Sequence, residues 1–90
     1  MSDAEALKAE LKKAIVRGLR LPMSPDEIGN DTPLFGEGLG LDSIDVLELV
    51  LELERSFGVQ IRDEETGNEV LRSIDTIAAF VERQRAERAV

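Results

Sequence analysis

The chain has 90 residues, which corresponds to one small domain, with 42% apolar residues, 33% charged residues and a formal net charge of -8. It contains no cysteine and no histidine, which excludes a disulfide framework, the usual zinc, haem and iron–sulfur sites, a Ser-His-Asp triad and a cysteine nucleophile. Its aromatic residues are three Phe, so we expect an aliphatic core, which favours packed helices over a sheet.

The first predicted element is an amphipathic helix that ends near Arg20, shortly before Pro22. Residues 2–5 have the pattern of a capping box, which marks a helix start. One side of the helical wheel carries small and apolar residues, namely Leu7, Leu11, Ala14, Ile15 and Gly18. Basic residues in the C-terminal half complement the helix dipole, at Lys12, Lys13, Arg17 and Arg20.

A long connection is expected over residues 21–41, because three prolines and four glycines prevent one continuous helix or strand there. Residues 24–27, Ser-Pro-Asp-Glu, can begin a single helical turn within it. Connections of this length are usually functional or disordered. Apolar residues along it argue against disorder and are expected to anchor it on the core, at Ile28, Leu34, Phe35, Leu39 and Leu41.

A second helix is predicted to start at Asp42 and Ser43 and to run to Phe57, with Gly58 just past its end. Its apolar residues form two stripes that together cover roughly 220° of the helical wheel, more than one core-facing helix requires. The first stripe is Val46, Leu49, Val50, Leu53 and Phe57, the second is Ile44, Leu47 and Leu51, and the remaining arc holds Asp45, Glu48 and Glu52. The second stripe either packs under the long connection or faces partner proteins.

A short or irregular third helix is expected within residues 63–71, where Gly67 disfavours a long one. Its acidic residues do not match a calcium loop, since counting from Asp63 puts a glycine where an oxygen ligand is needed. Ser73 is expected to cap a last helix with apolar residues at Ile74, Ile77, Ala78 and Val81, and Phe80 at the edge of their stripe. The sequence therefore predicts an all-α protein, a small four-helix bundle with a long loop between helices 1 and 2, formed by residues 1–90 as a single domain.

The acidic charge is concentrated in residues 21–71, which hold 13 acidic and 2 basic residues. Such a block repels nucleic acid and anionic lipid and attracts basic protein surfaces. No apolar run is long enough to span a membrane, and residues 1–20 lack the apolar region of a secretory signal, so we expect a cytoplasmic protein. The net negative charge favours a monomer. No pair of carboxylates is evident across a cleft, so neither an enzyme nor a metal site is expected.

Ser43 is the candidate functional residue, because it begins the acidic helix directly after a glycine-rich run, residues 36–41. The free N–H groups at a helix start favour a phosphate ester, although Asp42 and Asp45 would oppose its charge. For an isolated serine at this place a simple helix cap, by Ser43 or by Asp42, is the commoner interpretation. The surrounding residues alter that balance.

Residues 40–45, Gly-Leu-Asp-Ser-Ile-Asp, followed by Val-Leu-Glu-Leu at 46–49, resemble the attachment motif of acyl carrier proteins. The resemblance extends over nearly the whole chain and is strongest from Asp31 to Ile61. It implies a four-helix bundle in which Ser43 receives 4′-phosphopantetheine from coenzyme A, transferred by a separate Mg²⁺-dependent phosphopantetheinyl transferase. The thiol of that arm would carry acyl intermediates as thioesters to enzymes of lipid, fatty acid or polyketide biosynthesis, in a chain that has no cysteine of its own.

The resemblance also implies roles for other residues of the second helix. Asp42 matches the motif aspartate that lies beside the metal ion of the transferase. Partner recognition by the transferase and by acyl-loading and biosynthetic enzymes would use Ile44, Asp45, Glu48, Leu51 and Glu52. Basic patches on these enzymes would face the acidic residues, and Ile44 and Leu51 would be exposed apolar contacts. The acyl pocket would be lined by Leu49, Val50, Leu53 and Phe57.

Two features depart from short fatty-acid carriers. The segment 63–71 is longer, and the glycines at Gly36 and Gly38 resemble specialised carriers more than housekeeping ones. Two other functions are alternatives: a peptidyl or aminoacyl carrier, and an unmodified acidic interaction bundle in which Ser43 is only a cap. The peptidyl carriers usually have a less acidic recognition helix, and often a histidine where this chain has Asp42.

Overall fold

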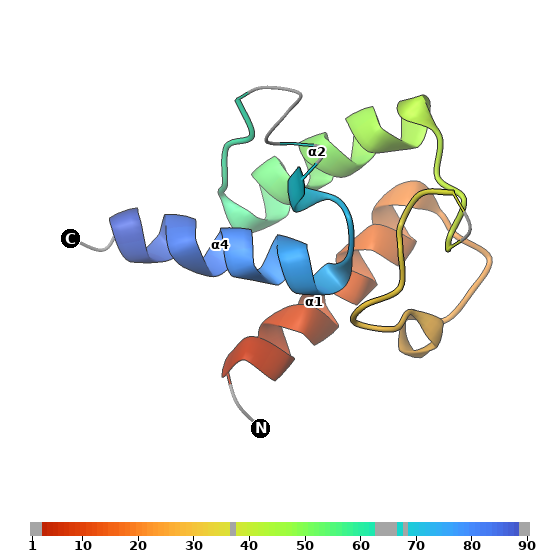
Figure 1. Cartoon of the computed structure of the whole chain (residues 1–90), viewed down its shortest axis with the longest axis horizontal. Coiled ribbons are helices and arrows are strands. Elements are labelled where there is room, and N and C mark those ends of the chain that lie inside the picture. The colour runs from red at the N-terminus through yellow and green to blue at the C-terminus, as the bar shows by residue number, and fades with distance from the viewer. Residues whose placement is uncertain (1–2, 37, 63–66, 68, 89–90) are drawn as a thin grey trace.

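The computed structural model describes residues 3–36, 38–62, 67 and 69–88. Within them the elements are α1 (Asp3–Leu19), a single 3₁₀ turn η1 (Pro25–Glu27), α2 (Ser43–Phe57) and α4 (Ile74–Arg88). Both α2 and α4 pack on α1, and the connection between α1 and α2 lies at the right of Figure 1, on the side away from the C-terminus. β-type pairing in this part of the chain is confined to one bridge, between Phe35 and Leu41.

The all-helical class is confirmed, whereas the count of four helices is not established. In the segment where a short third helix was expected, Gly67, Glu69 and Val70 are helical, and Leu71 donates its N–H to the carbonyl of Gly67 at 2.9 Å. Residues 63–66 and 68 of that segment lie outside the described residues, as does Ser2 of the capping box expected at the start of α1. None of the described helices is long and apolar enough to cross a membrane.

The core is aliphatic, as the composition predicts. Its largest fully buried side chains come from all three long helices and from the connecting segments: Leu11, Ile15, Ile28, Leu34, Leu49, Leu53, Leu71, Ile74, Ile77 and Val81. The predicted stripe of α1 faces this core, because Leu7, Leu11, Ala14 and Ile15 are all buried. Burial of these aliphatic faces is the main force that holds the helices together.

The long connection is anchored to the core, as its apolar residues predict. Ile28, Leu34 and Leu41 are 1%, 0% and 7% exposed. Backbone hydrogen bonds also tie the connection to the start of α4: the Leu34 N–H donates to the carbonyl of Arg72 at 3.0 Å, and the Asp75 N–H to that of Asn30 at 2.9 Å. The connection is therefore held both by its buried side chains and by backbone bonds to the start of α4.

The helix ends follow the predicted signals. Gly58 ends α2 in the left-handed conformation, with φ 68° and ψ 23°, which glycine adopts without strain. At the start of α4 the Thr76 N–H donates to Ser73 Oγ at 3.4 Å, and the Ser73 N–H donates to Thr76 Oγ1 at 3.0 Å. The predicted cap at Ser73 is thus confirmed.

Candidate functional site

Asp42, and not Ser43, is the N-cap of α2. Asp42 Oδ1 accepts hydrogen bonds from the N–H groups of Ile44 and Asp45, both at 3.0 Å, and Asp45 Oδ2 accepts the N–H of Asp42 at 3.0 Å. These reciprocal bonds form a capping box, and the spacing of the two aspartates is the sequence signal for it. Ser43, the first residue of α2, is exposed and makes no side-chain hydrogen bond with the described part of the chain.

The backbone just before Ser43 is held firmly. The Leu41 N–H donates to the carbonyl of Leu34 at 3.1 Å, and the Leu41 side chain is buried. Gly38 allows a close approach, because a Cβ at this position would lie 1.6 Å from the carbonyl oxygen of Pro33. The Ser43 hydroxyl is therefore presented to solvent from an anchored segment.

The second apolar stripe of α2 faces solvent and does not pack under the long connection. Ile44, Leu47 and Leu51 are 69%, 62% and 53% exposed. Glu48 is exposed beside them and Asp45 is half-buried. Large exposed apolar side chains that lie together beside polar ones are typical of protein interaction sites, and this row leads away from Ser43 along α2.

The other side of α2 faces the core. Leu49 and Leu53 are fully buried, while Val50 and Phe57 are half-buried and pack against the core cluster. Phe57 also lies below the guanidinium of Arg85, which is 5.8 Å from the ring centroid. The four residues expected around an acyl pocket therefore lie on the inner and flanking faces of α2.

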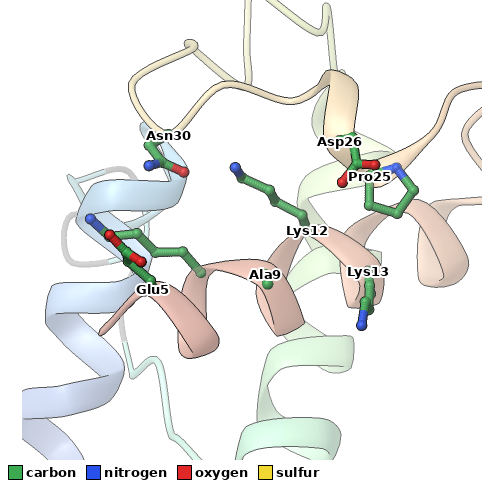
Figure 2. A pocket seen from close by; sticks show the side chains of 8 residues that line it. Glu5, Ala9, Lys12, Lys13, Pro25, Asp26 and Asn30 are labelled. Carbon is green, nitrogen blue, oxygen red and sulfur yellow. The ribbon is translucent and has the colours of Figure 1, made fainter. Parts of the chain in front are cut away.

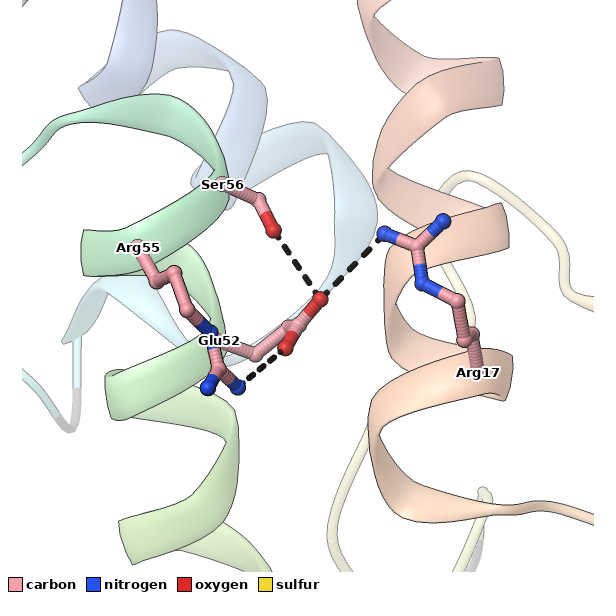
Figure 3. Close-up of polar contacts among 4 residues, drawn as sticks. All are labelled: Arg17, Glu52, Arg55 and Ser56. Carbon is pink, nitrogen blue, oxygen red and sulfur yellow. Dashed lines mark hydrogen bonds and ion pairs between the residues drawn. The ribbon is translucent and has the colours of Figure 1, made fainter.

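Glu52 is not placed as the sequence analysis expected. It was assigned to partner recognition, yet it is 6% exposed and points between α1 and α2 (Figure 3). Its carboxylate accepts from Arg55 Nη2 at 2.8 Å, from Ser56 Oγ at 2.9 Å and from Arg17 Nη2 at 3.3 Å. The hydrogen bond from Arg55, with smaller contributions from Ser56 and Arg17, lowers the pKa of Glu52 below its ordinary value, although burial acts in the opposite direction.

Gly18 makes room for this carboxylate, a role the sequence analysis did not assign to it. A Cβ at Gly18 would lie 3.0 Å from Cγ and 3.1 Å from Cδ of Glu52, at the tight limit of packing. The sequence did carry a signal for this role. Glycine is unfavourable inside a helix, and Gly18 lies on the buried stripe of α1, three helical turns after Leu7, which indicates a close approach by a neighbouring group.

A separate hollow lies between α1 and η1, where Lys12 extends toward the connection (Figure 2). Lys8 lines this hollow and pairs with Asp75 at 2.8 Å, and the hydrogen bond that Lys8 Nζ donates to Asp75 raises the pKa of Lys8. The hollow contains none of the predicted site residues. Among the described residues, no group of three or more His, Cys, Asp or Glu side chains is arranged to hold a metal ion.

A family model for the phosphopantetheine attachment site matches residues 9–82. An acyl carrier protein from Sulfurovum sp. (strain NBC37-1) is 38% identical over 77 residues, which are 86% of this chain and 96% of that protein. The chain belongs to the acyl carrier protein family. Another acyl carrier protein, from Thermosynechococcus vestitus, is 36% identical over 86 residues, or 96% of this chain and 99% of that protein. The anthracycline acyl carrier protein DauA of Streptomyces sp. (strain C5) is 40% identical over 84 residues, or 92% and 96% of the two chains.

Membership of the acyl carrier protein family defines the general role of the chain. It is a carrier, and the cofactor of the family is covalently attached 4′-phosphopantetheine. The residues present fit that group. The hydroxyl of Ser43 is exposed at the start of α2, and it is not used as a helix cap because Asp42 has that role. The chain has no thiol of its own, so the cofactor would have to supply the thiol that carries an acyl group.

Proposed function

We propose that Ser43 Oγ is the ester oxygen that holds 4′-phosphopantetheine and that the chain presents acyl groups from this position to biosynthetic enzymes. The observation that carries the proposal is that one residue caps α2 and its neighbour presents a hydroxyl that is not used in the cap. Asp42 caps α2 through Oδ1, and the hydroxyl of Ser43 is left exposed. When bound, the cofactor supplies the thiol on which the acyl thioester is carried.

Asp42 has a second part in the proposal. Both of its accepted hydrogen bonds end on Oδ1, and Oδ2 makes none with the described residues. That free oxygen supports the expectation that Asp42 faces the metal ion brought by the transferase. Asp42 would thus fix the helix start with one oxygen and contribute to metal binding with the other.

The exposed face of α2 is the proposed docking surface. Ile44 and Leu51 would supply its apolar contacts, and Asp45 and Glu48 its acidic ones. The exposure of Ile44, Glu48 and Leu51 supports this arrangement, whereas Asp45 is half-buried and accepts the N–H of Asp42 through Oδ2. We leave Glu52 out of this surface because its carboxylate is engaged by Arg17, Arg55 and Ser56. Docking enzymes would present apolar and basic residues to this face.

The acyl chain would enter beside the inner face of α2. Leu49 and Leu53 would contact it from the core, and the half-buried Val50 and Phe57 would form the entrance. Similarity over most of the chain to two anthracycline acyl carrier proteins from Streptomyces supports a specialised pathway as the source of the cargo.

The proposal is tested by intact mass after incubation with coenzyme A, Mg²⁺ and a broad-specificity phosphopantetheinyl transferase. We expect one phosphopantetheinyl addition, located by fragmentation at Ser43. Ser43→Ala should receive none, whereas Ser24→Ala, a matched control at another exposed serine before a helical turn, should be modified normally. A folded chain that stays unmodified beside a modified control carrier would leave Ser43 without this role.

A further inference from the structure

The outer surface around α2 carries opposite charges at its two ends. Asp42, Asp45 and Glu48 make the N-terminal half acidic. Near the C-terminal half the exposed charges are basic, at Arg55 on α2 and Arg20 just after α1. A helix surface whose charge changes from negative to positive along its length is more selective among docking enzymes than a uniformly acidic one.

The inward position of Glu52 produces this change of sign. One carboxylate pairs with two guanidiniums, those of Arg17 and Arg55, whose side chains are 71% and 75% exposed. The two guanidiniums therefore carry one positive charge more than the carboxylate neutralises, and both are largely exposed to solvent. Arg20 adds a second, since its exposed side chain makes no ion pair or hydrogen bond with the described residues.

Arg20 and Arg55, but not Arg17, line a groove that continues the docking surface, and the exposed Glu48 lines it as well. The α1 side of the groove is formed by Gly18, Leu19 and Arg20, and the α2 side by Glu48, Leu51, Glu52 and Arg55. Leu51, 53% exposed, belongs both to this groove and to the apolar stripe proposed to dock enzymes. A protein seated on the stripe therefore also reaches the arginines.

We propose that this groove, here called the arginine groove and defined by the seven residues just given, binds an Asp or Glu side chain of the enzymes that dock on the carrier. The inference rests on the proposed function of the α2 face as the docking surface. The guanidiniums of Arg20 and Arg55 offer forked N–H donors that match the geometry of a carboxylate. A docking patch with only basic residues would place like charges against them, so the arginine groove selects against such enzymes.

The test reverses one charge in the holo chain and measures kcat/KM of a purified acyl-loading enzyme from the same organism. Arg20→Glu is the variant, because the Arg20 side chain is exposed and no ion pair or hydrogen bond joins it to another described residue, so the melting midpoint should stay unchanged. Arg83→Glu, on the exposed side of α4, is the matched control with the same change in net charge. Glu48→Lys tests the acidic half of the docking surface in the same assay.

We expect Arg20→Glu to lower kcat/KM about threefold to tenfold at low ionic strength, with a smaller loss at high salt. Arg83→Glu should change kcat/KM less than about twofold. It alters the net charge by the same amount as Arg20→Glu, but Arg83 does not line the groove, so only long-range electrostatics remain. Replacing the facing acidic residue of the enzyme by Lys should restore the rate with Arg20→Glu and lower it with the parent chain.

Two results would overturn the inference. If Glu48→Lys lowers kcat/KM but Arg20→Glu behaves like Arg83→Glu or raises the rate, the docking surface stands and the arginine groove receives no carboxylate. If neither Glu48→Lys nor Arg20→Glu has an effect, the α2 face is not the docking surface. Attachment at Ser43 is judged separately, by the mass measurement.

Discussion

Replacing Glu52 with Gln should destabilise the fold although Glu52 lies on a helix with many other acidic residues. The substitution removes the charge from the bonds with Arg55 at 2.8 Å and Arg17 at 3.3 Å, while Gln can keep one carbonyl acceptor. Hydrogen bonds to charged groups contribute about 1.5 to 3 kcal/mol each when buried, but both arginines are mostly exposed, so solvent screening reduces the loss to about 1 to 2 kcal/mol. For a domain of this size, that lowers the melting midpoint by roughly 5 to 15 °C.

The assay is urea and thermal denaturation followed by circular dichroism, with Glu48→Gln as the matched control. Glu48 is exposed and makes no side-chain bond with the described residues, so its substitution should change stability by less than about 0.5 kcal/mol. Equal stabilities for Glu48→Gln and Glu52→Gln would show that the ion pairs of Glu52 contribute nothing measurable.

The effect of Glu52 should also depend on pH in a defined direction. Because the folded state lowers the pKa of Glu52 from its ordinary value of 4.5, its stabilisation is fully present above that value. It is lost as the pH falls through the lowered pKa. The difference in unfolding free energy between the parent and Glu52→Gln should therefore be constant near neutral pH and shrink below pH 4.5. A difference that grows on acidification would contradict the assigned sign.

Further substitutions test the packing and the caps by the same denaturation assay. Gly18→Ala should fail to give the gain of about 1 kcal/mol that helix propensity alone predicts, because its Cβ would press on Glu52; a full gain would contradict the tight contact. Asp42→Ala should cost about 1 kcal/mol through loss of the cap, whereas Ser43→Ala should cost less than about 0.5 kcal/mol; the reverse order would make Ser43 the cap. Higher ionic strength should raise the melting midpoint of the parent chain, since the net charge of -8 repels itself; a flat response would argue against that repulsion.

Local signals made most of the fold predictable from the sequence. The glycine at Gly58, the hydroxyl of Ser73 and the apolar spacing of α1 each act within a few residues, so the pattern alone located them. The burial of Glu52 was not predictable in this way. Its position on the helical wheel is that of an exposed acid. Its burial depends on the packing of α1 beside α2, which brings Arg17, 35 positions earlier in the chain, within 3.3 Å of the carboxylate. The helical wheel likewise could not decide whether the second stripe of α2 is covered by the long connection or exposed. That depends on the path of the connection, which the wheel does not contain.

Asp42 caps α2 and the Ser43 hydroxyl takes no part in the cap, which matters for attachment and removal of the cofactor. Since the capping bonds end on Asp42 and Asp45, esterification of the neighbouring hydroxyl breaks none of the hydrogen bonds that hold the helix. If Ser43 carries the arm as proposed, its attachment leaves the capping box at the start of α2 in place. Under the proposed function, the transferase acts on a chain in which α2 is already capped. Removal of the arm would leave the same capped helix, which could be modified again.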